Sequence, residues 1–262
     1  MRTENEPLAP AALFLFAHQD DEFGIFQKIV DELHAGSHVC CAYLTQGGHS
    51  NSLAERRNLE SLSVLSKLGV SNKDIFFAGD TLRIRDGKLL ENLDLASSWI
   101  QSWWSNYPQI RTLYVPAWEG GHPDHDALHA ITVRTAQKNN ILSLARQFSL
   151  YNGYRCIGPL FRVLLPIPLN GLVESRPISW KNRLRFLRHC LSYPSQIRTW
   201  IGLLPFVFLH YMVFGVQNTQ LISLERIKHR PHAKRLYYER RKFCTWENMA
   251  NRLSDRDDRS LN

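Results

Sequence analysis

The sequence is poor in the features that mark disulfide-rich, secreted and membrane-spanning proteins. Its 262 residues include five cysteines, an odd number, and no two of them form a Cys-x-x-Cys pair. This pattern argues against a disulfide framework and against a thiolate zinc site. The N-terminus lacks a basic segment followed by a long apolar run, so we expect no secretory signal. The predicted location is the reducing cytoplasm, and attachment to the inner face of a membrane is the alternative.

The composition shows no extreme bias either. Apolar residues make up 44% of the chain and charged residues 21%, as in a globular protein with a real core. The net charge of +8 indicates either a solvated basic surface or an anionic partner, such as a sugar nucleotide or a phospholipid head group. Residues 234–242 are basic and include two tyrosines, but no nucleic-acid-binding motif surrounds them, so we predict no nucleic-acid partner.

Short apolar runs alternate with segments of helical periodicity over the first 155 residues or so. Ser52 and Glu55 form a capping-box pattern that predicts the start of one of these helices. Strands are expected over residues 13–17, 39–44, 75–78, 113–115 and 148–151. The alternation predicts an α/β fold, Rossmann-like, with a mostly parallel sheet, helices on both faces and a less regular C-terminal region.

The pattern weakens from about residue 156, where prolines cluster. We expect residues 1–155 to form the core, residues 156–253 to form an extension packed on it, and residues 254–262 to form a disordered tail. Residues 200–216 are strongly apolar but shorter than the roughly 20 residues of a spanning helix. Three interpretations stay open for this segment: a buried core helix, an interfacial membrane contact flanked by basic residues, and a true span.

A first polar cluster follows the first predicted strand directly. It contains His18, Asp20, Asp21 and Glu22. Burying carboxylates is costly unless they are paired or bind a metal, and histidine together with aspartate suits zinc. A solvated acidic loop at a helix N-terminus is the alternative explanation of this cluster taken alone.

A second cluster, residues 119–126, follows the fourth predicted strand. Its histidines, His122 and His125, are three residues apart and are flanked by glycine and proline. Three protein ligands and a water would make an open catalytic zinc site. His129, one helical turn after His125, and His49 are weaker candidate ligands. Ligands of parallel sheets bind beyond the carboxyl ends of the strands, where both clusters are predicted to lie.

The two clusters together resemble the PIG-L/LmbE-type family of zinc-dependent sugar de-N-acetylases. Its members carry Ala-His-Pro-Asp-Asp-Glu after a strand and His-Pro-Asp-His later. Here residues 17–22 read Ala-His-Gln-Asp-Asp-Glu and residues 122–125 read His-Pro-Asp-His, and two such motifs in this order are a strong signal. Supporting features are a Thr-x-Gly loop at 45–47, an Arg-x-x-Glu helix segment at 57–60 and a Tyr-x-Ser-Gln stretch at 193–196.

The resemblance implies roles for the residues of both motifs. His18, Asp21 and His125 would hold the metal, which is zinc or another divalent ion. Asp20 would act as general base on a water molecule. His122, as an imidazolium, would stabilise the oxyanion or protonate the leaving amine.

Residues around the motifs receive secondary roles by the same resemblance. Arg57 and Asp80 are expected to bind the substrate, and Asp124 is expected to orient a histidine. Gln19 stands where the family has proline, which predicts a looser metal loop. Gly120 supplies no side chain at a position where some members carry a polar group.

The predicted function is that of a zinc-dependent hydrolase that removes the N-acetyl group from an N-acetylglucosamine-type sugar and releases acetate. The sugar would belong to a glycoconjugate or to a lipid- or nucleotide-linked precursor. A second hypothesis is a non-catalytic, metal-stabilised protein that binds glycans or membranes, and a third is a phosphoester hydrolase using the same metal. The predicted partners are an N-acetylated sugar and, through the C-terminal region, a membrane surface in peripheral contact.

Overall fold

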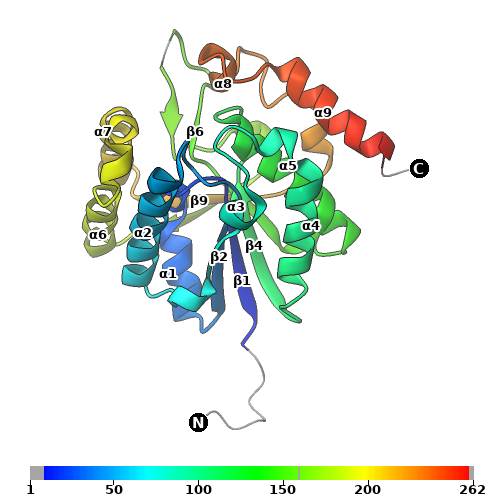
Figure 1. Cartoon of the computed structure of the whole chain (residues 1–262). Coiled ribbons are helices and arrows are strands. Elements are labelled where there is room, and N and C mark those ends of the chain that lie inside the picture. The colour runs from blue at the N-terminus through cyan, green and yellow to red at the C-terminus, as the bar shows by residue number, and fades with distance from the viewer. Residues whose placement is uncertain (1–8, 159, 260–262) are drawn as a thin grey trace.

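A seven-stranded sheet with helices on both faces organises the chain (Figure 1). The computed structural model describes residues 9–158 and 160–259. The strand order is β3-β2-β1-β4-β5-β9-β8. The bounds are β1 Ala11–Phe16, β2 His38–Tyr43, β3 Ile75–Phe77, β4 Ile110–Pro116, β5 Ala145–Phe148, β8 Val173–Pro177 and β9 Val216–Leu221. Strands β1 to β5 pair in parallel, which confirms the predicted α/β fold with its mostly parallel sheet.

Two hydrophobic clusters, one on each face of the sheet, form the core. Strands of a sheet covered on both sides are apolar throughout, and all six residues of β1 are buried. Leu13 and Leu15 face the cluster that includes α4, α5 and α9, whereas Phe14 and Phe16 face the one that includes α1, α2, α6 and α7. The helix bounds are α1 Phe26–His34, α2 Asn51–Leu68, α3 Ala78–Leu82, α4 Leu93–Trp104, α5 Pro123–Lys138, α6 Trp180–Cys190, α7 Ile197–Val213, α8 Tyr237–Arg240 and α9 Trp246–Arg259.

The start of α2 differs from the sequence prediction. Its N-cap is Ser50, whose hydroxyl accepts the Leu53 N–H at 3.3 Å, and not Ser52. Both serines precede a helical run, and the local pattern does not distinguish them. The other end of α2 is Gly69, which has a φ of 115°, a left-handed conformation that favours glycine.

The C-terminal region contributes to the main sheet. Strands β9 and β8 extend it past β5 in antiparallel pairing, and β6 (Tyr151–Asn152) pairs separately with β7 (Arg162–Val163). Helix α9 continues to Arg259, into the residues for which a disordered tail is predicted; residues 260–262 lie outside the described part of the chain.

Two carboxylates of the core hold the C-terminal region against it. The Tyr193 hydroxyl donates to the buried Glu22 at 2.9 Å. The Ser195 hydroxyl donates to Glu60 at 2.5 Å, and the Ser195 N–H donates to the same carboxylate at 3.0 Å. The Tyr-x-Ser-Gln and Arg-x-x-Glu stretches of the sequence are therefore partners in space.

Helix α7 explains the long apolar segment. One of its faces packs on the core through Trp200, Leu203, Val207 and Tyr211, while the opposite face is exposed. Among the residues described, no helix combines the length and the apolar character that crossing a bilayer requires.

Candidate metal centre

The first polar cluster is a tight loop after β1, at the point where the strand order reverses between β1 and β4. Crevices at such positions are the usual ligand sites of open parallel sheets. Asp21 turns back and accepts the N–H groups of Ala17 at 3.0 Å and His18 at 2.8 Å. Asp20 has a φ of 105°, an uncommon conformation for a residue other than glycine. The loop thus holds its polar side chains in a fixed arrangement.

Three predicted ligands converge on one point. His125 Nε2 lies 3.2 Å from His18 Nδ1 and 3.0 Å from Asp21 Oδ1. A tetrahedral zinc ion with bonds of about 2.0–2.1 Å would set its ligand atoms about 3.3 Å apart. All three residues are buried. Two imidazole nitrogens facing each other beside a carboxylate therefore form a donor set that fits a divalent ion.

The second nitrogen of His18 is also held by a carboxylate. Asp124 Oδ2 lies 3.0 Å from His18 Nε2, and the same carboxylate accepts the N–H groups of Gly87 at 2.6 Å and Leu89 at 3.0 Å. Such a carboxylate fixes the ring orientation of a metal-binding histidine and its tautomer. The structure thus places Asp124 where the sequence analysis predicts an orienting group.

Asp86 is a member of the site that the sequence analysis missed. Its Oδ1 lies 3.2 Å from His18 Nε2 and 3.9 Å from His122 Nε2. These three residues form a second potential metal-binding group beside the first. Burial raises the pKa of Asp86, but the positive charges of His18 and Arg57 oppose that rise, and the pKa lies far below its usual value. The dipeptide Asp-Gly at 86–87 is typical of a turn, and nothing in the neighbouring sequence indicates that Asp86 lies beside His18.

The site is dense in charge. Burial lowers the pKa of His18, but the carboxylates of Asp86, Asp124 and Asp21 outweigh it and hold that pKa well above its usual value. Burial raises the pKa of Asp21, but the adjacent His125 and His18 reverse the shift and keep it ionised.

Asp20 lines the cleft beside the ligands and contacts Arg57 Nη2 at 3.2 Å. Burial raises the pKa of Asp20 to about 7, although the guanidinium of Arg57 opposes that shift. This carboxylate is a stronger base than a solvated one, as a proton acceptor near neutral pH requires.

His122 is the N-cap of α5, and its Nδ1 accepts the Asp124 N–H at 3.2 Å. Burial and the neighbouring His18 lower the pKa of His122 to about 4. The ring is therefore neutral at pH 7 and carries its proton on Nε2. This differs from the imidazolium that the sequence analysis suggests.

The two predicted substrate contacts have different surroundings. Arg57 is 5% exposed and donates to the carbonyls of Gly47 and Gln19, so its guanidinium supports the metal loop as well as lining the cleft. Asp80 is exposed, accepts from Asn58 at 2.6 Å and does not belong to the residues that line the cleft.

Gln19 is held firmly in place of the usual proline. Its side-chain nitrogen donates to Asn58 at 2.7 Å and to the Thr45 carbonyl at 3.3 Å. Asn58 in turn donates to Asp80. These hydrogen bonds restrain the loop through the Gln19 side chain, whereas a proline would restrain the loop through its backbone.

The remaining histidines lie outside the ligand cluster. His129 Nδ1 lies 2.8 Å from the Pro116 carbonyl oxygen, and its ring is fully buried beside Trp118. His49 is an exposed residue of the cleft wall. Among the described residues, neither belongs to a group that could hold a metal ion.

The ligands open into a cleft of about 710 Å³, a volume suited to a small molecule. Its wall combines both motifs with residues of the C-terminal region, including Arg198 and Leu203 of α7, Tyr237 of α8, and Arg241 and Phe243. The C-terminal region therefore forms part of the cleft wall.

Part of the chain matches a known protein family. Residues 13–136 match the family model PIG-L, described as GlcNAc-PI de-N-acetylase. A search of curated proteins gave no match.

Solved structures share the fold at low identity. A deacetylase of the teicoplanin biosynthesis pathway is 15% identical, with a TM-score of 0.56, covering 73% of this chain and 87% of that one. N,N'-diacetylchitobiose deacetylase from Pyrococcus horikoshii is 16% identical, with a TM-score of 0.54 and coverages of 82% and 83%. A conserved protein from Thermus thermophilus is 16% identical, with a TM-score of 0.55 and coverages of 82% and 94%.

The matched segment, residues 13–136, contains most of β1, all of β2 to β4, both polar clusters and all three converging ligands. The resemblance seen in the short motifs thus extends over the four strands that lie around them. Over this segment, the chain is similar to the PIG-L family of de-N-acetylases.

Proposed function

We propose that this protein is a metal-dependent hydrolase that removes the acetyl group from an N-acetylglucosamine-type sugar. The observation that carries the proposal is the convergence of His18, Asp21 and His125 at a cleft that also contains Asp20 and His122. Zinc in such a donor set would polarise the acetyl carbonyl and lower the pKa of water to about 7.

Two residues of this chain would handle protons. Asp20 accepts a proton from the water that attacks the acetyl carbon, and returns it to the sugar nitrogen as the carbon–nitrogen bond breaks. His122 donates a hydrogen bond from its protonated Nε2 to the oxygen that becomes negative during the attack. The products are acetate and the free amine.

Positioning of these groups would come from the surrounding hydrogen bonds. Asp124 orients the His18 ring through Nε2 at 3.0 Å. Arg57 keeps Asp20 at the cleft wall through a contact of 3.2 Å, and by the family resemblance it would also bind the substrate. Asp80 does not line the cleft, and its role in substrate binding stays a prediction from that resemblance. Tyr237 and Phe243 offer apolar ring surface to a sugar, while Arg198 and Arg241 suit a phosphate group of a linked carrier.

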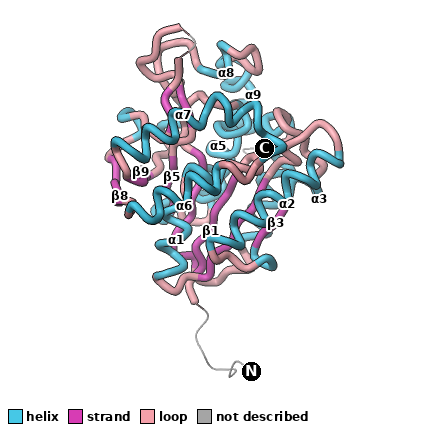
Figure 2. Tube along the Cα trace, turned by 90° about the vertical axis from the view of Figure 1, so that its left-hand side faces the viewer, coloured by secondary structure: helices cyan, strands magenta, loops and turns pink. Residues whose placement is uncertain are grey.

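We further propose that the substrate is carried by a lipid and that the C-terminal region contacts an anionic membrane surface. Helices α6 and α7 lie on the face turned to the viewer in Figure 2. Their exposed apolar side chains, with Phe214 after α7, are Trp180, Leu184, Ile197, Ile201, Phe208, Leu209, Val213 and Phe214.

The charge around this surface matches that partner. Lys181, Arg188 and Arg198 are exposed on the same two helices. An apolar helix face bordered by basic residues is typical of helices that lie in a membrane interface. Helix α7 also lines the cleft through Arg198 and Leu203, so a lipid-linked sugar at the surface would lie close to the metal ligands.

The catalytic proposal is tested by acetate release from purified protein loaded with zinc, against free, nucleotide-linked and lipid-linked N-acetylated sugars. Asp20→Asn is expected to reduce turnover by at least about a hundredfold while zinc still binds at one equivalent to the His18 site. A protein that binds zinc there but releases no acetate from any of these substrates is the non-catalytic protein of the second hypothesis.

The membrane proposal has its own experiment. The double variant Ile201→Ser with Phe208→Ser is expected to lose sedimentation with vesicles of anionic phospholipid, because both side chains are more than half exposed and contribute apolar contact with the bilayer. Leu95→Ser, at an exposed position of α4 on the other face of the sheet, is the matched control. Equal sedimentation of both variants would contradict the proposed surface.

A further inference from the structure

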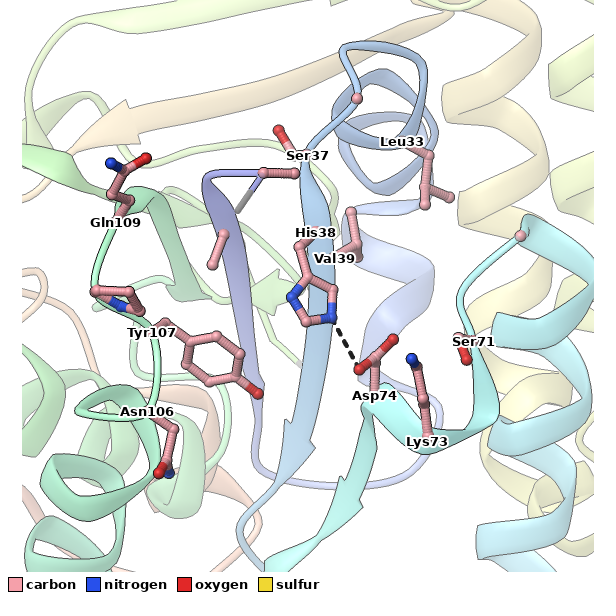
Figure 3. Close-up of a pocket in the computed structure, with 15 residues that line it drawn as sticks. Leu33, Ser37, His38, Val39, Ser71, Lys73, Asp74, Asn106, Tyr107 and Gln109 are labelled. Atoms are coloured by element: carbon pink, nitrogen blue, oxygen red, sulfur yellow. Dashed lines mark hydrogen bonds and ion pairs between the residues drawn. The ribbon is translucent and has the colours of Figure 1, made fainter. Parts of the chain in front are cut away.

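A second group of metal-ligand side chains lies at the opposite end of the sheet. His38 opens β2, Asp74 precedes β3 and Tyr107 precedes β4, so all three lie at the amino ends of the strands. They line a pocket of about 520 Å³ (Figure 3). The metal ligands of the PIG-L motifs lie at the carboxyl ends, so this pocket is separate from the cleft.

Strand geometry brings the cysteine into this group. His38 and Cys40 are two residues apart on β2, and successive side chains of a strand alternate between the faces. Both therefore point to the face covered by α4, where Cys40 is buried, while Cys41 points to the other face. Asp74 reaches the same point from the segment that leads into β3.

Three different donor atoms meet there. His38 Nε2 lies 2.9 Å from Asp74 Oδ1 and 3.6 Å from Cys40 Sγ, and all three atoms lie within 4.8 Å of one another. Tetrahedral zinc, with bonds of about 2.3 Å to sulfur and 2.0–2.1 Å to nitrogen, sets those two atoms about 3.5 Å apart. The observed nitrogen–sulfur distance agrees with that value.

The arrangement differs from a nucleophilic triad. In such a triad the histidine contacts the nucleophile through one ring nitrogen and the carboxylate through the other. Here Cys40 and Asp74 both contact Nε2. The three donor atoms are therefore mutual neighbours, as the ligand atoms around one metal ion are.

The three side chains differ in burial. Cys40 is fully buried and Asp74 is 9% exposed, whereas the His38 side chain is 41% exposed and borders the pocket. Burial raises the pKa of the Cys40 thiol to about 11, and Asp74 adds to that rise. The thiol is therefore uncharged by itself, and a divalent ion would displace its proton to solvent, together with any proton on His38 Nε2.

We propose that His38, Cys40 and Asp74 form a second zinc-type site, with three protein ligands and a fourth position open to the pocket. It would connect the start of β2 to the segment before β3. The exposed edge of His38 provides the path by which the ion enters from the pocket. This proposal does not depend on the proposed deacetylase activity, and either proposal can hold without the other.

Cobalt is a suitable probe because thiolate ligation gives a strong near-ultraviolet charge-transfer band. The first metal centre contains no cysteine, so the band reports the second site alone. Metal-free full-length protein titrated with Co²⁺ is expected to bind two equivalents and to develop the band. Cys40→Ser is expected to bind one equivalent without the band, and Cys41→Ser, on the other face of the strand, is the matched control that keeps both.

Two further variants test the second site if Cys40→Ser is uninformative. If Cys40→Ser does not fold, His38→Gln, at a partly exposed position, is expected to lower the cobalt affinity measured from the band at least about tenfold. His18→Ala removes the first site and is expected to keep the band. Absence of the band in the folded wild-type protein, or its persistence in Cys40→Ser, overturns the proposal without bearing on acetate release.

Discussion

Replacing Asp124 by asparagine tests whether the hydrogen bond behind His18 controls metal binding. The Asp124 carboxylate receives two backbone N–H groups and faces His18 Nε2 at 3.0 Å. An asparagine has one oxygen, and the N–H groups of Gly87 and Leu89 compete for it. Its NH₂ group would then face His18 and require Nε2 to act as an acceptor.

The consequence is a change of tautomer. With Nε2 as acceptor, the neutral His18 ring carries its proton on Nδ1, the atom that lies 3.2 Å from His125 Nε2 and would bind the metal. Loss of such an orienting carboxylate costs about 10- to 100-fold in metal affinity, which is about 1.4–2.7 kcal/mol. We expect Asp124→Asn to show that loss in a competition titration of zinc against a chromophoric chelator.

Asp126→Asn is the matched control. Asp126 is an equally buried carboxylate two residues on, but it accepts the N–H groups of Glu119 and Gly120 and contacts no metal ligand. It is expected to lower the melting temperature while zinc affinity changes less than about threefold. Unchanged zinc affinity in a folded Asp124→Asn protein, or an equal loss in both variants, would refute the tautomer argument. Thermal unfolding of the metal-free proteins separates affinity from stability.

Three other variants give independent checks. Tyr193→Phe removes the donor to buried Glu22 and is expected to cost about 1–3 kcal/mol, measured by chemical unfolding; a loss below about 0.5 kcal/mol would contradict that role. Gly121→Ala places a Cβ 2.1 Å from the Tyr151 carbonyl oxygen, and this clash is expected to lower both the melting temperature and turnover. Gly158→Ala is the control: its Cβ meets no other atom, and only the left-handed backbone, with a φ of +58°, is strained. Burial lowers the pKa of His129 to about 4, so as the pH falls the unfolded chain takes up a proton at His129 before the folded chain does. The contribution of the neutral His129 to the free energy of unfolding is therefore complete above about pH 6.5 and is lost as the pH falls towards 4. His129→Asn should lose less stability than the wild type between about pH 7 and pH 4.5, and equal losses would contradict this assignment.

The sequence was informative where a short segment determines its own structure. Buried parallel strands appear as apolar runs, and His18 and His125 follow two of them, so strand adjacency alone brings the ligands together. The order β2-β1-β4 could not be read from the chain, but the family resemblance supplied the pairing of the two motifs.

Other members of the site depend on contacts between distant segments. Asp86 lies in a turn-forming dipeptide after α3, and only the tertiary structure brings it to His18 at 3.2 Å. The donor group at His38 was missed for a similar reason: His38 and Cys40 share β2, but Asp74 reaches them from the segment before β3, and no sequence spacing indicates that contact. The ionisation of His122 also required its neighbours, since burial and His18 lower its pKa together.

The hydrogen bond from Tyr193 to Glu22 has a consequence for the order in which the protein matures. Synthesis proceeds from the N-terminus, and domains begin to fold as they emerge. When residues 13–136 leave the ribosome, β5 is not yet complete and Glu22 has no hydroxyl donor from Tyr193, although its other oxygen receives the Asp20 N–H at 3.0 Å. We therefore expect the metal loop to acquire its final rigidity late, after more than two-thirds of the chain has been made, so a truncated product would carry the family motifs without a working centre.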